Sequence, residues 1–229
     1  MDIQVIASGS KGNCYSISTG KTTLMLECGI SYREIQKALN FDLSSIKACL
    51  ITHEHRDHCK AYKDLLKRGI PLGMSKGTKE SLDINTGRII ELESRKEIII
   101  GDFKVKPFDV VHDCKEPLGF QIESLVTKER LVFFTDTMYS KYTFKEIDYY
   151  MVECNYTEDR LNTNREENRW LNRVKKSHMS LETLVEFFKA TDLSKTKEIY
   201  LMHLSDTNSD YEWILKTIRE TTGKIVRIC

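Results

Sequence analysis

Residues that can bind metal are concentrated in the segment 53–58, which reads HEHRDH. It lies directly after the β-rich run 48–52 and before a run with helical spacing. Because alternate side chains at a strand end point the same way, His53 and His55 can converge on one ion, and Asp57 and His58 can turn toward a second. Imidazole and carboxylate together suit zinc, manganese or iron rather than calcium. A histidine-rich loop can also be plain polar surface, but four such residues in six positions favour a metal site.

Three further ligand-type residues each follow an apolar run: His112 after FDVV, Asp136 after LVFFT and His203 after IYLM. Singly, each could be an ordinary turn residue. Together with the first segment they complete two ligand sets, which are His53, His55 and His112 for one ion, Asp57, His58 and His203 for the other, and Asp136 as the bridge. Two ions about 3.5–4 Å apart can generate hydroxide at neutral pH and clamp the oxygens of an in-line displacement.

This ordered series, THEHRDH, His112, TDT around Asp136 and then His203, resembles the metallo-β-lactamase superfamily over almost the whole chain. The stretches ASGSKGN from Ala7 and HDCKEPLGF from His112 further resemble the small YycJ-type branch of presumed nucleases and its phage relatives, the anti-Pycsar cyclic-nucleotide phosphodiesterases. The resemblance implies an α/β fold, the αββα sandwich, with the metals at one sheet edge. We therefore expect a single domain over residues 1–229.

A second pair of residues points to phosphodiester chemistry. Glu153 ends the run DYYMVEC, and His178 precedes a helical run in KSHMSLETL. They resemble the tRNase Z pair in which a Glu after a strand and a His in a His-Ser-Thr motif form a dyad over the scissile phosphate, although this chain reads His178, Met179, Ser180. A His oriented by a carboxylate can protonate a leaving alkoxide. Alternatively, His178 is a helix-start residue satisfied by the backbone. We assign catalytic roles to Asp57, Glu153 and His178.

Two other features allow more than one interpretation. Glu27 stands where the superfamily usually has Asp after an apolar strand, and it either orients a metal ligand or caps a turn. The turn SGSKGN carries Ser8, Ser10, Lys11 and Asn13, which could contact a substrate phosphate. A tight hairpin explains that turn equally well.

The elements that must position these residues follow from hydrophobic periodicity. We expect strands at 3–7, 15–18, 23–27, 48–52, 97–100, 103–108, 119–124, 131–136, 149–154, 198–203 and 224–228. Helical spacing predicts helices at 31–40, 57–69, 180–190 and 210–223. Strands dominate early and helices are added late, which indicates a layered α/β fold rather than a pure parallel sheet.

Composition restricts the class of protein. The chain has 229 residues, of which 40% are hydrophobic and 30% charged, and this hydrophobic fraction argues against a disordered chain. Its net charge of +1 argues against a protein that coats a nucleic-acid polymer. No apolar run approaches the roughly 18 residues of a membrane span, and no signal peptide is evident. Seven scattered cysteines without a C-x-x-C pair indicate neither disulfides nor a thiolate zinc site, and we expect mostly reduced core residues. We expect a cytoplasmic protein, in the host cell if it is phage-encoded.

A basic run precedes His178. Arg165, Arg169 and Arg173 recur every four residues, so a helix would present them on one face. That face is solvated surface, a guide for an anionic substrate, or a surface that reaches a neighbouring subunit's site. We expect a homodimer.

The sequence thus predicts a hydrolase with two divalent transition-metal ions, zinc with manganese as the alternative. The resemblance implies a phosphodiesterase for small cyclic nucleotides, a phage-type counter-defence against cyclic-nucleotide immune signalling. The alternative is a YycJ-like DNA exonuclease or a tRNase Z-like RNA endonuclease. A third hypothesis, a non-catalytic metal-binding regulatory or interaction protein, fits less well because the ligand set is complete. We expect a small anionic nucleotide as partner, nucleic acid under the alternative, and no membrane.

Overall fold

The strands and helices fall into two units in the computed structural model, which describes residues 1–163 and 168–229. Unit 1 comprises Met1–Asp109 and Cys114–Glu129, and unit 2 comprises Val110–Asp113 and Arg130–Cys229. None of the described helices is both long and apolar enough to cross a membrane.

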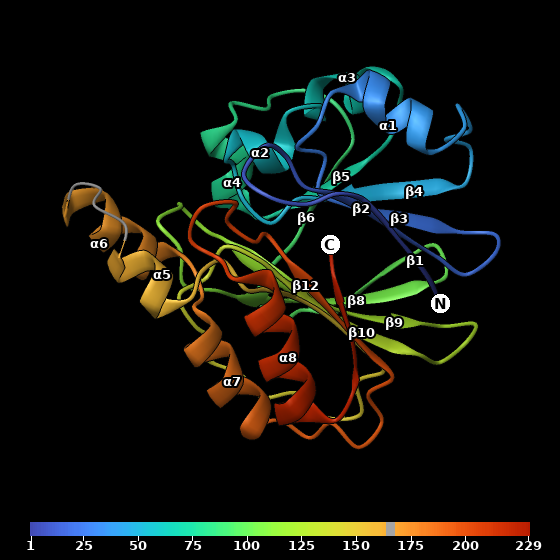
Figure 1. Cartoon of the computed structure of the whole chain (residues 1–229). Coiled ribbons are helices and arrows are strands. Elements are labelled where there is room, and N and C mark those ends of the chain that lie inside the picture. The colour runs from blue at the N-terminus through green and yellow to red at the C-terminus, as the bar shows by residue number, and fades with distance from the viewer. Residues whose placement is uncertain (164–167) are drawn as a thin grey trace. The chain divides into compact units, whose positions relative to one another are not determined.

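Unit 1 contains a six-stranded sheet in the simple order β1 to β6 (Figure 1). Its first three strands pair antiparallel and the rest pair parallel. The strands are β1 (Asp2–Ala7), β2 (Cys14–Ser18), β3 (Thr23–Leu26), β4 (Ile46–Leu50), β5 (Leu72–Met74) and β6 (Ile89–Glu91). The unit also holds the antiparallel strands β7 (Ile98–Ile100), β8 (Phe103–Asp109) and β9 (Leu118–Ser124).

Short helices pack on the six-stranded sheet: α1 (Tyr32–Ala38), α2 (Arg56–Cys59), α3 (Tyr62–Lys67) and α4 (Lys76–Ser81). Ile35 of α1 and Leu65 of α3 are fully buried in one apolar cluster with Cys49 of β4 and Leu72 of β5. Removal of this apolar surface from water fixes the helices on the sheet. It also fixes the loops between strand ends and helix starts.

The predicted helix 57–69 is wrong as a continuous element, because α2 ends at Cys59 and α3 begins at Tyr62. The carbonyl of Asp57 accepts from the backbone N–H of Asn13 at 2.7 Å, and the N–H of Ala61 donates to Cys28 at 2.9 Å. These two backbone groups therefore cannot form the i to i−4 hydrogen bonds of a continuous helix. The break ties the metal-ligand segment to two neighbouring loops.

The region 70–91 contains β5, α4 and β6, which the sequence analysis did not predict. Each strand has three residues and α4 has six, with a glycine at its second position. Segments this short hold too few residues for a periodic pattern.

Unit 2 contains four parallel strands, β10 (Arg130–Phe134), β11 (Tyr149–Glu153), β12 (Glu198–Met202) and β13 (Ile225–Ile228). Its helices are α5 (Glu158–Thr163), α6 (Asn168–Ser177), α7 (Leu181–Lys189) and α8 (Tyr211–Thr222) (Figure 1). The ring of Phe187 on α7 packs edge-on against Phe134 of β10 and Tyr150 of β11. Ser180 caps α7 by accepting a hydrogen bond from the N–H of Thr183.

The register of the parallel strands explains where polar residues gather. Phe134 pairs with Val152 and Glu153 pairs with Met202, so the carboxyl ends of β10, β11 and β12 share one edge of unit 2. In unit 1, Leu26 pairs with Leu50, which brings the ends of β3 and β4 together. Residues that follow these strands therefore cluster, as ligands do in open α/β sheets.

Candidate metal centre

His53 and His55 lie in the loop between β4 and α2, with their ring nitrogens directed at each other. Nε2 of His53 is 3.1 Å from Nδ1 of His55. The other nitrogen of His53, Nδ1, lies 2.8 Å from the hydroxyl of Thr52, which fixes the orientation of this buried ring. Two imidazole nitrogens this close can bind one cation.

His58 and Asp57 form a second group in unit 1. Nε2 of His58 lies 3.3 Å from a carboxylate oxygen of Asp57, and Nδ1 lies 3.6 Å from Oε1 of Glu27. His58 and Glu27 are both fully buried. Burial raises the pKa of the Glu27 carboxyl, although His58 opposes the shift. The Glu27 carboxylate accepts from the backbone N–H of Thr52 at 3.3 Å, whereas its 3.6 Å separation from Nδ1 of His58 exceeds a hydrogen bond, so the orienting role of Glu27 stays a prediction.

Asn13 secures the same loop from the turn 8–13. Its buried side-chain amide lies 3.3 Å from Nε2 of His58 and also donates to the carbonyl of Gly9. The N–H of Gly29 donates to the carbonyl of Asn13, and a Cβ added to Gly29 would lie 1.6 Å from the carbonyl oxygen of Asp57. Only glycine permits this close approach.

The other predicted substrate contacts lie on the same turn. Ser8 accepts a hydrogen bond from the hydroxyl of Tyr15, while Ser10 and Lys11 are exposed. The contact of these side chains with a substrate stays a prediction.

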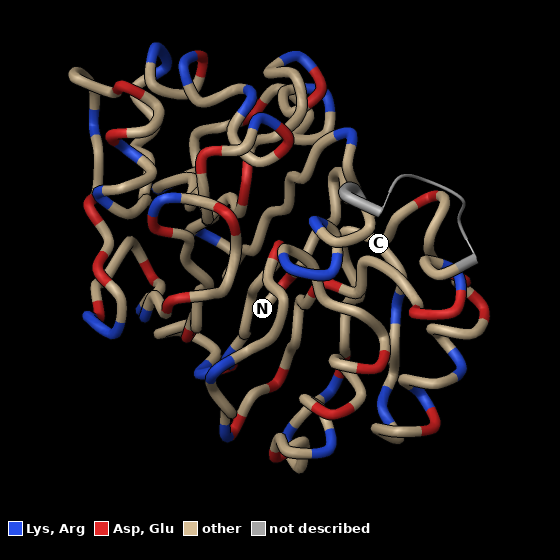
Figure 2. The backbone as a smooth tube through the Cα atoms, turned by 90° about the vertical axis from the view of Figure 1, so that its left-hand side faces the viewer, with Lys and Arg blue, Asp and Glu red and all other residues tan. Residues whose placement is uncertain are grey.

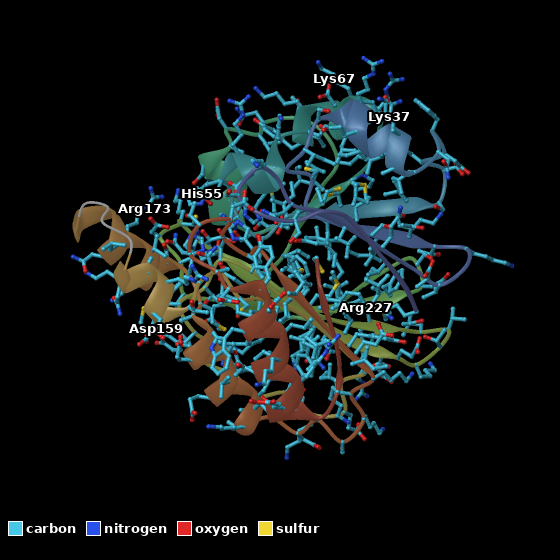
Figure 3. The ribbon with its side chains drawn as sticks, in the orientation of Figure 1. Lys37, His55, Lys67, Asp159, Arg173 and Arg227 are labelled. Carbon is cyan, nitrogen blue, oxygen red and sulfur yellow. The ribbon has the colours of Figure 1, made fainter. Side chains whose placement is uncertain are left out.

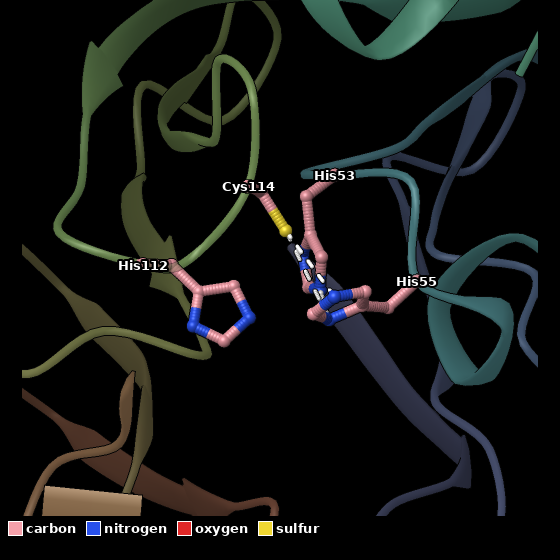
Figure 4. Close-up of side chains that lie close together, drawn as sticks. All are labelled: His53, His55, His112 and Cys114. Atoms are coloured by element: carbon pink, nitrogen blue, oxygen red, sulfur yellow. Dashed lines mark hydrogen bonds between the residues drawn. The ribbon is translucent and has the colours of Figure 1, made fainter. Parts of the chain in front are cut away.

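Cys114 lies beside the histidine pair in unit 1. Its sulfur is 3.6 Å from Nε2 and 3.9 Å from Nδ1 of His55 (Figure 4). A ligand role for this residue was not predicted from the sequence, where it is one of seven cysteines, five of which are buried as expected. Its place two positions after His112, in a motif already singled out, was the signal that could have identified it.

Unit 2 brings together His112, Asp136 and His203. One carboxylate oxygen of Asp136 lies 3.6 Å from Nε2 of His112, and the other lies 3.7 Å from Nε2 of His203. A carboxylate with one imidazole at each oxygen has the arrangement that a bridging ligand needs. Nδ1 of His112 lies 2.9 Å from the carbonyl of Ser177, so Nε2 is left to face Asp136.

Backbone strain coincides with these positions. Glu27, Asp136 and His203 have φ angles of 63°, 48° and 53°, in the left-handed region that non-glycine residues rarely adopt. Each strained residue costs about 1–3 kcal/mol and persists where surrounding structure over-determines it, often at functional sites. The strain turns these side chains at the points where β3, β10 and β12 end.

Glu153 and His178 form the predicted dyad. Nδ1 of His178 is 2.6 Å from Oε1 of Glu153, and Oε2 of Glu153 accepts from the backbone N–H groups of Thr137 and Met179. Burial disfavours the imidazolium, but Glu153 and Asp136 outweigh it and raise the pKa of His178. Burial likewise opposes ionisation of Glu153, yet His178 holds the pKa of that carboxyl below its usual range.

The predicted arginine face is described only at Arg173, because Arg165 and the side chain of Arg169 lie outside the described residues. Arg173, which is labelled in Figure 3, lies on α6. It forms a 3.2 Å ion pair with Asp113, the neighbour of His112 in the sequence. Both side chains are largely exposed, so the pair contributes little stability.

A profile described as "Beta-lactamase superfamily domain" matches residues 22–204. The chain belongs to the β-lactamase superfamily. It is 28% identical to Exodeoxyribonuclease WalJ of Streptococcus pneumoniae strain D39 over 222 residues, which is 90% of this chain and 82% of that protein. It is 27% identical to Exodeoxyribonuclease YycJ of Bacillus anthracis over 228 residues, 91% of this chain and 84% of that one. The metallo-β-lactamase fold protein YhfI of Bacillus subtilis superposes with a TM-score of 0.77 at 16% identity, covering 99% and 95% of the two chains.

These comparisons confirm the predicted fold class and the resemblance to the YycJ-type branch of this superfamily. Family membership and the ligand clusters also confirm a metal-dependent hydrolase. The relation to the anti-Pycsar enzymes, the extent of the domain over 1–229 and the roles of individual site residues stay predictions.

Proposed function

We propose that this superfamily member hydrolyses phosphodiester bonds of a nucleotide substrate, with His178 as the proton donor to the departing sugar oxygen. The observation that carries the proposal is the 2.6 Å contact between His178 and the buried Glu153. A leaving alkoxide is a strong base and needs a proton from a positioned acid.

The dyad supports this role through its geometry. Glu153 engages Nδ1 of His178, so Nε2 is the atom left to hold the transferable proton. Two backbone N–H groups fix the second carboxylate oxygen, so the His178 ring is held in one orientation. The raised pKa of His178 favours the imidazolium, which is the form that can donate a proton. After transfer, His178 regains a proton from water.

The metal part of the proposal uses the seven predicted ligands. The donors in each unit fit transition metals, because they are imidazoles and carboxylates held by buried hydrogen bonds. Four of them, His53, His55, Asp57 and His58, belong to unit 1, and three, His112, Asp136 and His203, belong to unit 2. When bound, such ions act as Lewis acids toward a phosphoryl oxygen and make water nucleophilic at neutral pH.

For the substrate, a small cyclic mononucleotide is the first candidate. Lys and Arg number 35 against 34 Asp and Glu, and both signs are interspersed along the chain (Figure 2). A long polyanion usually selects a strongly basic surface. DNA ends are the second candidate, because two relatives that cover nine-tenths of this chain are named exodeoxyribonucleases.

A substrate panel tests the proposal. Purified, metal-replete protein is incubated with 2′,3′- and 3′,5′-cyclic mononucleotides, single-stranded DNA and precursor tRNA, and product masses are measured. Opening of a cyclic nucleotide, with KM changing only a few-fold between about 50 and 200 mM salt, supports the first candidate. Trimming of DNA that collapses over that range supports the second. Inertness toward every phosphodiester refutes the proposal and favours a non-catalytic metal-binding protein.

Two further predictions accompany this function. The homodimer is checked by light scattering of the protein in solution. The cytoplasmic location is checked by fractionating cells that make the protein.

A further inference from the structure

The sulfur of Cys114 lies beside His53 and His55. None of the seven predicted metal ligands accounts for a thiol at this place. The donor atoms of His53, His55 and Cys114 all lie within 4.8 Å of one another. All three residues belong to unit 1, and thiolate and imidazole are both donors that zinc accepts.

The separations of these donors match a shared ion. Zinc–nitrogen bonds of about 2.0–2.1 Å and zinc–sulfur bonds of about 2.3 Å, at tetrahedral angles, place two nitrogens about 3.3 Å apart and a nitrogen and a sulfur about 3.6 Å apart. Nε2 of His53 and Nδ1 of His55 are 3.1 Å apart. The sulfur of Cys114 is 3.9 Å from the same Nδ1. Each distance differs from expectation by a few tenths of an ångström.

Hydrogen bonds of the residues after Cys114 hold its backbone in place, so the position of the thiol is fixed by the fold. The N–H of Lys115 donates to the carboxylate of Glu54. The carbonyl of Glu116 accepts from the hydroxyl of Ser75 at 2.7 Å, and its carboxylate accepts from the N–H of Gly77 at 2.6 Å. These contacts tie the segment to α4 and to the histidine loop within unit 1.

We propose that Cys114 is a thiolate ligand of the ion held by His53 and His55. The inference rests on the metal centre of the proposed function and names a ligand beyond the seven. On binding, the S–H bond gives its proton to water and the sulfur forms the bond to the metal. A soft thiolate selects zinc or cobalt over manganese, so Cys114 determines which metal this site retains.

Cobalt substitution tests the proposal. Protein loaded with Co²⁺ should show a thiolate-to-cobalt charge-transfer band in the near ultraviolet. Cys114→Ser should lose this band, keep its far-ultraviolet circular dichroism and bind zinc at least about tenfold more weakly. The matched control is Cys229→Ser, which replaces the other half-buried cysteine and should keep the band. A band that survives in Cys114→Ser, or that is missing from fully cobalt-loaded protein, overturns the inference.

A thiol-protection experiment keeps the test decisive if Cys114→Ser misfolds. Burial raises the pKa of Cys229 to about 12, so its thiol should react slowly with a disulfide reagent. Metal-free wild-type protein should expose one fast-reacting thiol at Cys114, which zinc should protect. Equal reactivity with and without zinc contradicts the proposal. Protein that binds two ions and hydrolyses substrate without a thiolate band refutes only the role of Cys114, whereas protein that binds no metal refutes the proposed function.

Discussion

Replacement of His178 by alanine separates proton donation from metal binding. The His178 side chain is 19% exposed and its Nδ1 bonds Glu153, so its removal deletes the donor while the seven predicted ligands stay in place. We expect His178→Ala to retain both ions. With a substrate that leaves as an alkoxide, kcat should fall by about 10²–10⁴-fold, the usual contribution of general acid catalysis. That loss corresponds to about 3–5 kcal/mol of transition-state stabilisation.

The assay compares two leaving groups. Bis(p-nitrophenyl) phosphate releases an aryloxide that needs no proton, so His178→Ala should lose far less activity on it than on a nucleotide. Metal content is measured on the same preparations. The control Ser180→Ala removes the cap of α7, which should cost about 1 kcal/mol of stability and leave both rates near wild type.

Equal losses on the two substrates would refute the proton-donor argument, because a donor matters only where the leaving group is basic. In that case His178 positions the substrate. Loss of metal in His178→Ala would refute it differently, by making His178 a ligand in the cluster with Asp136 and His203.

The remaining predictions concern the metals and the dyad. Asp136→Asn, which keeps a residue tolerant of the left-handed φ of 48°, should lose metal and activity together in elemental and kinetic assays, and a fully metallated active variant would contradict the bridging role. Gly29→Ala should displace the Asp57 carbonyl and lower metal content. The control Gly20→Ala strains a φ of 87° but has nothing within 4 Å of the added Cβ, so it should lose some stability and keep two ions; equal metal content in both variants would contradict the packing argument. Glu153→Gln removes the carboxylate that raises the pKa of His178, so the alkaline limb of the pH–rate profile should move to lower pH, and an unmoved limb would show that another group sets it.

Most of the strand ends that carry the candidate site were predictable from sequence. Runs such as 131–134 and 199–202 are each apolar over four residues, and the polar residues that follow them mark the edge of the sheet. The prediction used local periodicity only, so it succeeded where a strand was long enough to show a pattern.

The sequence analysis failed where contacts between distant segments override local preference. The run 57–69 has good helical spacing, but Asn13 and Cys28 take the backbone groups that a continuous helix would use. The role of Cys114 was missed for a related reason. Its contact with His55, which is 59 positions away, cannot be read from the sequence, where its place two positions after His112 was the local signal.

The turn 8–13 holds predicted metal ligands in place and also carries the predicted substrate contacts. Asn13 was predicted as a phosphate contact, yet its side chain and backbone hold the carbonyl of Asp57 and the ring of His58. Its neighbour Gly12 has a φ of 152° and lies against the carbonyl of Gly29. The turn 8–13, the loop around Gly29 and the loop that carries Asp57 therefore pack against one another. The predicted phosphate contact of the exposed Ser10 and Lys11 can therefore be tested separately from the positioning contacts of Asn13. A substitution at Lys11 should change KM alone, whereas one at Asn13 should change metal affinity.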